Sequence, residues 1–230
     1  MKQKAITLLS GGLDSAVATL LAQKRYNIAL ALTFDYGQRA AAREIETAKA
    51  FCRHYKISHE VISLPWLTVI SHSPLTDNSK SLPKFKAGEL GKTRKREKKS
   101  ARAVWVPNRN AVFVNIAAAY AEAKHCSTIV SGFNAEEAQT FPDNSIRFIE
   151  TENKLLLSST LSHPKLVSPT QKMNKIEIAR SALKLGLDTR FFWSCYEGGA
   201  KMCGRCESCA RTIRAFRTIG AWEVISKQFK

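Results

Sequence analysis

The stretch Leu9-Ser10-Gly11-Gly12-Leu13-Asp14-Ser15 decides how the rest of the chain is interpreted. It follows the apolar run 5–9, which has the length of a buried strand, and it precedes apolar residues at helical spacing. Two consecutive glycines let the backbone approach a ligand closely, and the start of a helix presents unpaired N–H groups. The turn therefore predicts a site for a phosphate or pyrophosphate. The structural alternative is a tight turn in which Asp14 or Ser15 caps the helix.

Apolar runs alternate with segments of helical periodicity along most of the chain. Strands are predicted at residues 5–9, 28–34, 60–64, 128–133 and 165–168. Helices are predicted after the glycine turn and near 41–55, 109–123, 146–157 and 175–185, the last opening on a capping box of Asn174 and Glu177. This alternation predicts an α/β fold, a Rossmann-like parallel sheet with helices on both faces. Ligands of such folds bind beyond the carboxyl ends of the strands.

Composition excludes several classes of protein. The 230 residues are 44% hydrophobic, which is enough to bury a core, and no apolar run approaches the ~18 residues of a membrane span. Too few apolar residues precede the glycine pair for a secretory signal, so we expect a cytoplasmic protein with no membrane partner.

Basic residues are concentrated in one segment. The net charge is +17, and residues 80–102 hold ten lysines or arginines against two glutamates. We interpret about 76–103 as a solvated, mobile loop, with binding of nucleic acid as the alternative.

Four of the six cysteines lie close together near the C-terminus, as Cys195-x7-Cys203-x2-Cys206-x2-Cys209. Four thiolates at this spacing can close a tetrahedral site without an open position, which favours one structural Zn²⁺. An iron–sulfur cluster and free or redox-active thiols are the alternatives. The sequence thus predicts a nucleotide-binding domain over 1–190 and a zinc-binding segment, packed on it, over 191–230. Cys52 lies on an apolar helical stripe and is predicted to be a core residue.

Further motifs follow the glycine turn in order. They are Phe34-Asp35-Tyr36-Gly37-Gln38-Arg39, Val106-Pro107-Asn108-Arg109-Asn110, Gly132, Phe141-Pro142-Asp143, and Ser194-Cys195-Tyr196 before the remaining cysteines. Together with the SGGLDS turn they resemble the 7-cyano-7-deazaguanine synthase (QueC) family of PP-loop ATP pyrophosphatases. The resemblance implies ATP-dependent conversion of 7-carboxy-7-deazaguanine and ammonia to the nitrile preQ0, a precursor of queuosine. It also implies Mg²⁺ with the nucleotide, a structural zinc and a homodimer.

Residues of the motifs are assigned to roles on this basis. Residues predicted to bind the nucleotide are Leu9, Ser10, Gly11, Gly12, Leu13, Asp14, Ser15, Ala16, Val17, Ala18, Thr19, Asp35, Arg39 and Asn110. Asp14, on an exposed rim, is predicted to hold Mg²⁺ or its waters, and it is grouped with Ser15 and Arg109 as catalytic. Asp143 and Glu137 are predicted to contact the substrate, Asp143 by accepting from a guanine-like edge. Structural alternatives are a helix-opening turn with an exposed Arg109 and a helix cap at Asp143.

The chain also departs from the family pattern. Ala40 stands where histidine is usual, and Glu137, Gln139, Thr140, Phe141 and Asn144 replace Asp, Ser, Gly, Tyr and Cys. Beyond the last cysteine, Thr212 and Ala215 stand where Arg and Gly are usual. A related enzyme with another acceptor is therefore one alternative. A tRNA-modifying PP-loop enzyme and a non-enzymatic zinc knuckle that binds nucleic acid are two others.

Overall fold

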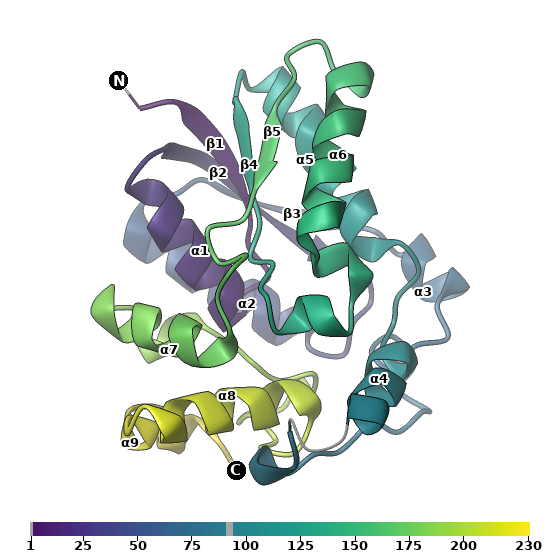
Figure 1. Ribbon diagram of the computed structural model, residues 1–230, viewed down its shortest axis with the longest axis vertical. Helices are drawn as coiled ribbons and strands as arrows, with labels where there is room; N and C mark the ends of the chain where they lie inside the picture. Colours follow the sequence, from purple (N-terminus) through teal and green to yellow (C-terminus); the bar gives the residue numbers. More distant parts are fainter. Residues whose placement is uncertain (1, 91–93) are drawn as a thin grey trace.

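A parallel sheet forms the centre of the molecule. The computed structural model describes residues 2–90 and 94–230 (Figure 1). The strands are β1 (Lys4–Leu8), β2 (Asn27–Asp35), β3 (His59–Ser63), β4 (Thr128–Val130) and β5 (Lys165–Val167). They pair in the order β3-β2-β1-β4-β5, all parallel. The predicted α/β class is confirmed, and each predicted strand is present with ends shifted by a few residues.

Strand order reverses between β1 and β4, which lie side by side at the centre of the sheet. Thr7 of β1 pairs with Ala31 of β2 and with Val130 of β4, so β1 and β4 end at nearly the same level. The segments that follow these strands must therefore emerge next to each other. This is the place where open α/β sheets bind ligands.

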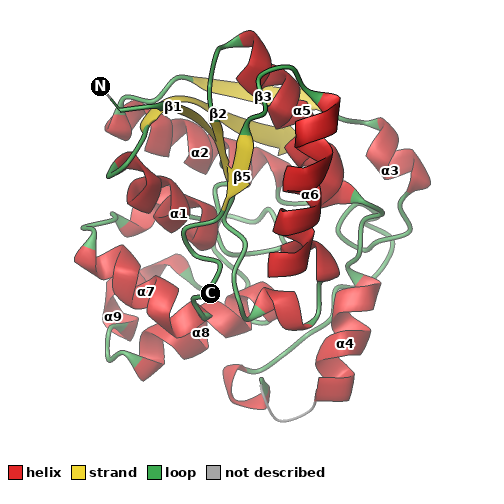
Figure 2. Ribbon diagram, turned by 45° about the horizontal axis from the view of Figure 1, so that its top comes forward, coloured by secondary structure: helices red, strands yellow, loops and turns green. Residues whose placement is uncertain are grey.

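Helices cover both faces of the sheet (Figures 1 and 2). On one face α1 (Leu13–Gln23) and α2 (Ala41–Tyr55) share a hydrophobic core with the sheet, and Cys52 lies in it, as predicted. On the other face lie α5 (Arg109–Ala123) and α6 (Ile146–Ser159), with a separate core that includes Val114 and Leu156. Among the described residues, no helix has the length and apolar character needed to cross a bilayer.

The C-terminal part packs against α1 and lies below it in the view of Figure 1. It comprises α7 (Lys175–Lys184), α8 (Glu207–Thr218) and the short α9 (Trp222–Ile225). The capping box that opens α7 is confirmed, since Asn174 accepts from the N–H groups of Ile176 and Glu177. Phe216 of α8 belongs to the same core as Leu13 of α1, so residues after 190 share a hydrophobic core with the part of the chain that forms the sheet.

The basic segment differs from its prediction. After the short α3 (Trp66–Ile70), residues Arg94–Ala103 form the helix α4, which packs near α8 (Figure 1). Ser100 and Ala101 are buried, and the Ser100 hydroxyl is hydrogen-bonded to the buried Glu207 carboxylate of α8. Upstream, the N–H of Phe85 donates to the carbonyl of Arg205 at 2.7 Å. The interpretation of 76–103 as a loop is therefore wrong for 94–103, because small residues on one side of α4 dock on the C-terminal segment. Residues 91–93 of this segment lie outside the described residues.

Candidate active site

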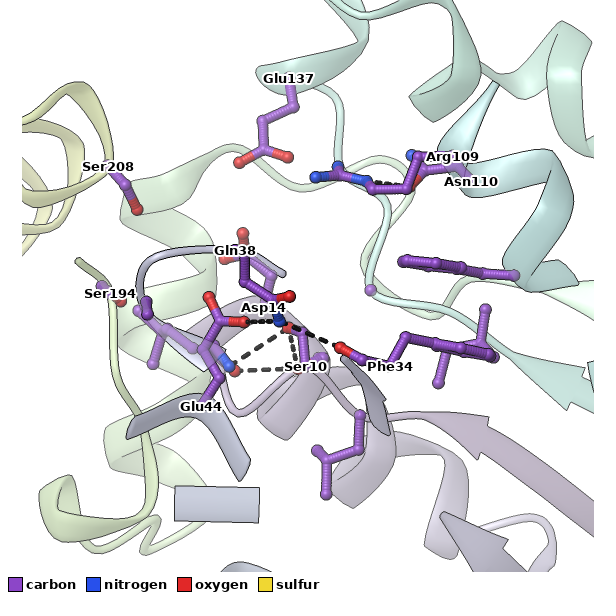
Figure 3. Close-up of a pocket in the computed structure, with 18 of the residues that line it drawn as sticks. Ser10, Asp14, Phe34, Gln38, Glu44, Arg109, Asn110, Glu137, Ser194 and Ser208 are labelled. Atoms are coloured by element: carbon purple, nitrogen blue, oxygen red, sulfur yellow. Dashed lines mark hydrogen bonds between the residues drawn. The ribbon is translucent and has the colours of Figure 1, made fainter. Parts of the chain in front are cut away.

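A pocket opens at the carboxyl ends of β1, β2 and β4, as the strand order predicts (Figure 3). One part of its wall is polar and includes the glycine turn, Asp14, Glu137 and Lys175. Another part is apolar, and in it the rings of Phe34 and Phe113 stack with centroids 4.1 Å apart and planes 4° apart. The pocket can therefore take a ligand with a charged end and a flat ring.

The glycine turn has the geometry of an anion site. Gly11 has φ +74°, a backbone conformation that favours glycine. The helix α1 begins at Leu13, and among the described residues no side chain caps it. Ser15 donates its hydroxyl hydrogen to the carbonyl of Gly12 at 3.0 Å, so it does not act as a cap. The capping alternative is thus wrong, and the first N–H groups of α1 remain available to a phosphate.

Gly132 lets the loop after β4 lie against this turn. A Cβ atom at position 132 would stand 2.7 Å from the backbone nitrogen and Cα of Ser15. Such distances cannot be relieved by moving a flexible side chain, because both contacts are with backbone.

We therefore expect Gly132→Ala to displace the glycine turn. The variant should lose about 1–3 kcal/mol of its free energy of unfolding, as overpacked sites do, and its affinity for ATP should fall. Urea denaturation and equilibrium ATP binding measure the two effects. Gly88→Ala is the matched control, because its Cβ would meet nothing within 4 Å. Unchanged ATP affinity in Gly132→Ala would show that the turn does not need this close approach.

Asp14 forms an ion pair, and its side chain is only 16% exposed, so it does not lie on an open rim as the sequence predicted. Its carboxylate lies 2.5 and 2.7 Å from Nζ of Lys175, and Nδ2 of Asn134 donates to it at 3.2 Å. The Lys175 side chain is 5% exposed. Burial alone would lower the pKa of Lys175, but the charges of Asp14 and Glu137 outweigh burial and hold that pKa above its ordinary value. A fixed ammonium group therefore lies beside the anion site.

Lys175 is a site residue that sequence reasoning missed. Its signal was present, since the capping box places it at the first position of a helix that follows β5. Strand β5 ends at the same edge of the sheet as β1, and this topology brings together residues 161 apart in the chain.

A second charge network joins this site to α8. Glu136 accepts from Arg211 at 2.9 Å, from Arg214 at 2.5 Å and from the backbone N–H of Lys175 at 3.2 Å. Arg211 also donates to Glu207 at 2.6 Å. Burial opposes ionisation of Glu136, but the two arginines keep its pKa below the ordinary value. The acidic residue next to the predicted Glu137 is thus a structural link.

Arg109 stands on the pocket wall and is not simply an exposed residue at a helix start. It donates to the hydroxyl of Tyr36 at 2.9 Å, and its guanidinium lies 5.4 Å from the centroid of the Tyr36 ring. Asn110 lines the pocket as well, and its amide donates to the carbonyl of Asp143 at 3.4 Å.

The structure brings about half of the residues predicted for the nucleotide and the substrate to the pocket wall, and Gly11 is not among them. Lining it are Leu9, Ser10, Gly12, Leu13, Asp14, Ser15, Arg109, Asn110 and Glu137. Among the departures from the family pattern, Ala40, Phe141 and Asn144 line it too. Ala16, Val17, Ala18 and Thr19 are buried within α1 and do not line it.

Three predicted contacts point elsewhere. The carboxylate of Asp35 accepts from the N–H of Gly37 at 3.1 Å, and the guanidinium of Arg39 donates to the carbonyl of Asp77 at 2.6 Å. Asp143 accepts from its neighbour Asn144 at 3.3 Å and is not among the residues of the pocket wall. Direct contact of these side chains with a ligand in this pocket is not supported.

The four C-terminal cysteines form one buried cluster. Their sulfur atoms all lie within 4.8 Å of one another, and none forms a disulfide. Backbone N–H groups point at the sulfurs, among them those of Glu197 and Cys203, both 3.3 Å from Sγ of Cys195. This donor set fits a metal that takes four thiolates, such as Zn²⁺. The cluster adjoins the glycine turn, because the N–H of Trp193 donates to the carbonyl of Gly11 at 2.7 Å.

The parallel sheet and the SGGLDS turn at its switch point define a protein of the PP-loop ATP pyrophosphatase fold. A 4-thiouridine synthetase solved with RNA and ATP shares this fold, with a TM-score of 0.50 and 16% identity over 97% of this chain and 53% of that one. The model of the family described as queuosine biosynthesis protein QueC matches residues 4–220, and the chain belongs to this family.

Relatives in the family match along nearly their whole length. The 7-cyano-7-deazaguanine synthase of Pelotomaculum thermopropionicum is 48% identical over 217 residues, which are 94% of this chain and 98% of the relative. The protein of the same name from Desulforudis audaxviator is 49% identical over 221 residues, 96% of this chain and 100% of the relative.

Proposed function

We propose that this protein is a 7-cyano-7-deazaguanine synthase, which converts 7-carboxy-7-deazaguanine, ammonia and ATP into preQ0. The observation that carries the proposal is the pocket itself: an uncapped helix start and the buried Lys175 lie at one part of its wall and stacked aromatic rings at another. Similarity to synthases along their full length supports the choice of reaction.

The chemistry requires activation of an inert group. A carboxylate does not react with ammonia because its leaving group would be oxide. Transfer of AMP from ATP to the carboxylate, with release of pyrophosphate, makes an acyl adenylate with a better leaving group, and ammonia then gives the amide. A second activation, at the amide oxygen, followed by elimination, gives the nitrile.

The chain's own groups can position and neutralise these phosphates. The N–H groups at the start of α1, with the hydroxyls of Ser10 and Ser15, bind the phosphates that ATP presents. Lys175 supplies a fixed positive charge beside them. Asp14, which belongs to the turn, would offer its carboxylate oxygens to Mg²⁺ or its waters, and bound Mg²⁺ would neutralise further phosphate charge.

Substrate binding is assigned to the wall beyond the turn. Arg109 presents a planar guanidinium suited to a carboxylate or phosphate, and the stacked Phe34 and Phe113 suit a flat bicyclic base. Glu137 lines the same pocket. Asp143 contributes indirectly: its backbone carbonyl accepts a hydrogen bond from the side-chain amide of Asn110 and so helps to position Asn110 on the pocket wall.

We further assign residues 1–190 to nucleotide and substrate binding, and 191–230 to one structural zinc on Cys195, Cys203, Cys206 and Cys209. A cytoplasmic homodimer that uses small-molecule substrates is part of this proposal. Light scattering of the purified protein measures the oligomeric state.

The test is a mass-spectrometric assay with Mg-ATP, ammonium and 7-carboxy-7-deazaguanine. We expect preQ0 to form, with nucleotide product, at a rate that depends little on added salt. A folded protein that binds ATP and forms no nitrile would indicate another acceptor. A steep loss of activity with salt, with RNA as the productive substrate, would instead favour a tRNA-modifying enzyme.

A further inference from the structure

Glu44 is a pocket carboxyl with no role in the function described so far. It lies in the first turn of α2 and lines the pocket. Its backbone is in contact with the glycine turn, because a Cβ atom on Gly11 would stand 2.5 Å from the carbonyl oxygen of Glu44. Glu44 is therefore close to the phosphates that the turn is proposed to hold.

The side chain of Gln38 fixes the Glu44 carboxyl. Its Nε2 donates to Glu44 at 2.9 Å and to the carbonyl of Phe34 at 3.0 Å, while its Oε1 accepts from the N–H of Tyr36 at 2.9 Å (Figure 3). Both ends of the amide are thus engaged, and Gln38 is 5% exposed. The orientation of the carboxyl is set before any ligand arrives.

Glu44 differs from the other acidic residues near the pocket in its charge environment. Asp14 and Glu137 are paired with Lys175, and Glu136 with two arginines. Within residues 2–90 and 94–230 Glu44 makes no ion pair, and an uncharged amide is its hydrogen-bond partner. Burial raises the pKa of Glu44 to about 7; the bond from Gln38 and the charge of Arg109 act against burial, and Asp35 acts with it. Glu44 is partly buried, and a partly buried carboxyl without a cation is a site for a small cation that can give up a proton.

We propose that Glu44 binds ammonia as the ammonium ion and removes the proton that frees it for attack. The inference rests on the proposed synthase reaction and adds a catalytic residue to it. Glu44 takes one proton from ammonium, and the lone pair of the freed ammonia forms a C–N bond to the activated carboxyl carbon. The bond between the carboxyl carbon and the oxygen that joins it to phosphorus then breaks, and this oxygen keeps the electron pair. The amide nitrogen keeps two of the four ammonium hydrogens; Glu44 has taken one of the others, and the last passes from nitrogen to the departing phosphate oxygen.

The position of Glu44 favours ammonium over the edge of the base as its ligand. The carbon under attack is joined through one oxygen to a phosphate at the glycine turn, so the nucleophile must approach beside the turn. Glu44 is the described pocket acid that both contacts the turn and lacks a cation.

Glu44→Gln tests the proposal, because glutamine can keep the bond to Gln38 but cannot accept a proton. Glu46→Gln is the matched control, on the same helix with a side chain that is 67% exposed. We expect Glu44→Gln to raise the KM for ammonium and to lower kcat by about 10²-fold. Exchange of pyrophosphate into ATP, dependent on the carboxylate substrate and measured without ammonium, should persist. With hydroxylamine, which is largely unprotonated at neutral pH, the loss should be smaller.

Other outcomes would overturn the proposal. A raised KM for the carboxylate substrate with an unchanged KM for ammonium would mean that Glu44 binds the deazaguanine base of the substrate and not ammonium. Loss of pyrophosphate exchange would make Glu44 part of the nucleotide site. Absence of nitrile with the unmodified protein would contradict the proposed function itself, and that result is obtained before any variant is measured.

Discussion

Asp14→Ala is expected to abolish ATP-dependent turnover and also to lower the free energy of unfolding by about 3 kcal/mol. The activity is lost because the proposed ligand of Mg²⁺ is gone from the glycine turn. The stability is lost because Lys175, with a side chain 5% exposed, keeps its charge while its closest partner disappears. Glu137 remains 3.9 Å away and is a weaker substitute. Removing one partner of a buried pair typically costs about 3–5 kcal/mol.

The double variant Asp14→Ala/Lys175→Met separates the two losses. Methionine removes the uncompensated charge and fills similar space, so most of the stability should return while turnover stays absent. Urea denaturation and the nitrile assay measure both quantities in each variant. Glu60→Gln is the control, because its pair with Lys124 is exposed and should contribute at most about 1 kcal/mol. If the double variant were less stable than Asp14→Ala, the buried pair would not be the source of the loss.

Local patterns in the sequence were enough to predict the fold and the centre of the site. The glycine turn, the cysteine spacing and the capping box at Asn174 each depend on neighbouring residues, and the structure contains all three. The partner of Asp14 could not be predicted in this way, because Lys175 lies 161 residues away and meets Asp14 only through the strand order.

Composition misled the prediction at the basic segment. Lysines and arginines indicated a solvated loop, but the docking of α4 depends on Ser100 and on Glu207, 107 residues further along. The prediction for Arg39 was misled in a similar way. Because Arg39 follows β2, it was predicted to bind the nucleotide. Its guanidinium instead bonds the carbonyl of Asp77, a contact between segments 38 residues apart. The type of a residue shows that a charged or polar group needs a partner, but it does not show which distant group is that partner.

The cysteine cluster is expected to hold the C-terminal segment against the active site. Cys206 caps α8 by accepting from the N–H of Cys209 at 3.5 Å, and Glu207 follows it in the helix. From Glu207 the charge network runs through Arg211 to Glu136 and so to the backbone of Lys175. Loss of the metal should therefore disturb the nucleotide site as well as the segment itself.

Cys206→Ser should lose its zinc and much of its stability together. The four-cysteine site does not exist in the unfolded chain, so the free energy of metal binding stabilises the folded state. Its apparent value is about 10–16 kcal/mol in small zinc-finger peptides. Metal per chain by plasma mass spectrometry, thermal unfolding and ATP affinity should all fall. Cys126→Ser is the matched control, since that thiol is also buried but lies outside the cluster, so the variant should keep its metal. If the unmodified protein contained iron and absorbed visible light, the four cysteines would hold an iron–sulfur cluster and not zinc. A metal-free Cys206→Ser protein with full stability would mean that packing alone, through the core shared by Phe216 and Leu13, holds the segment in place.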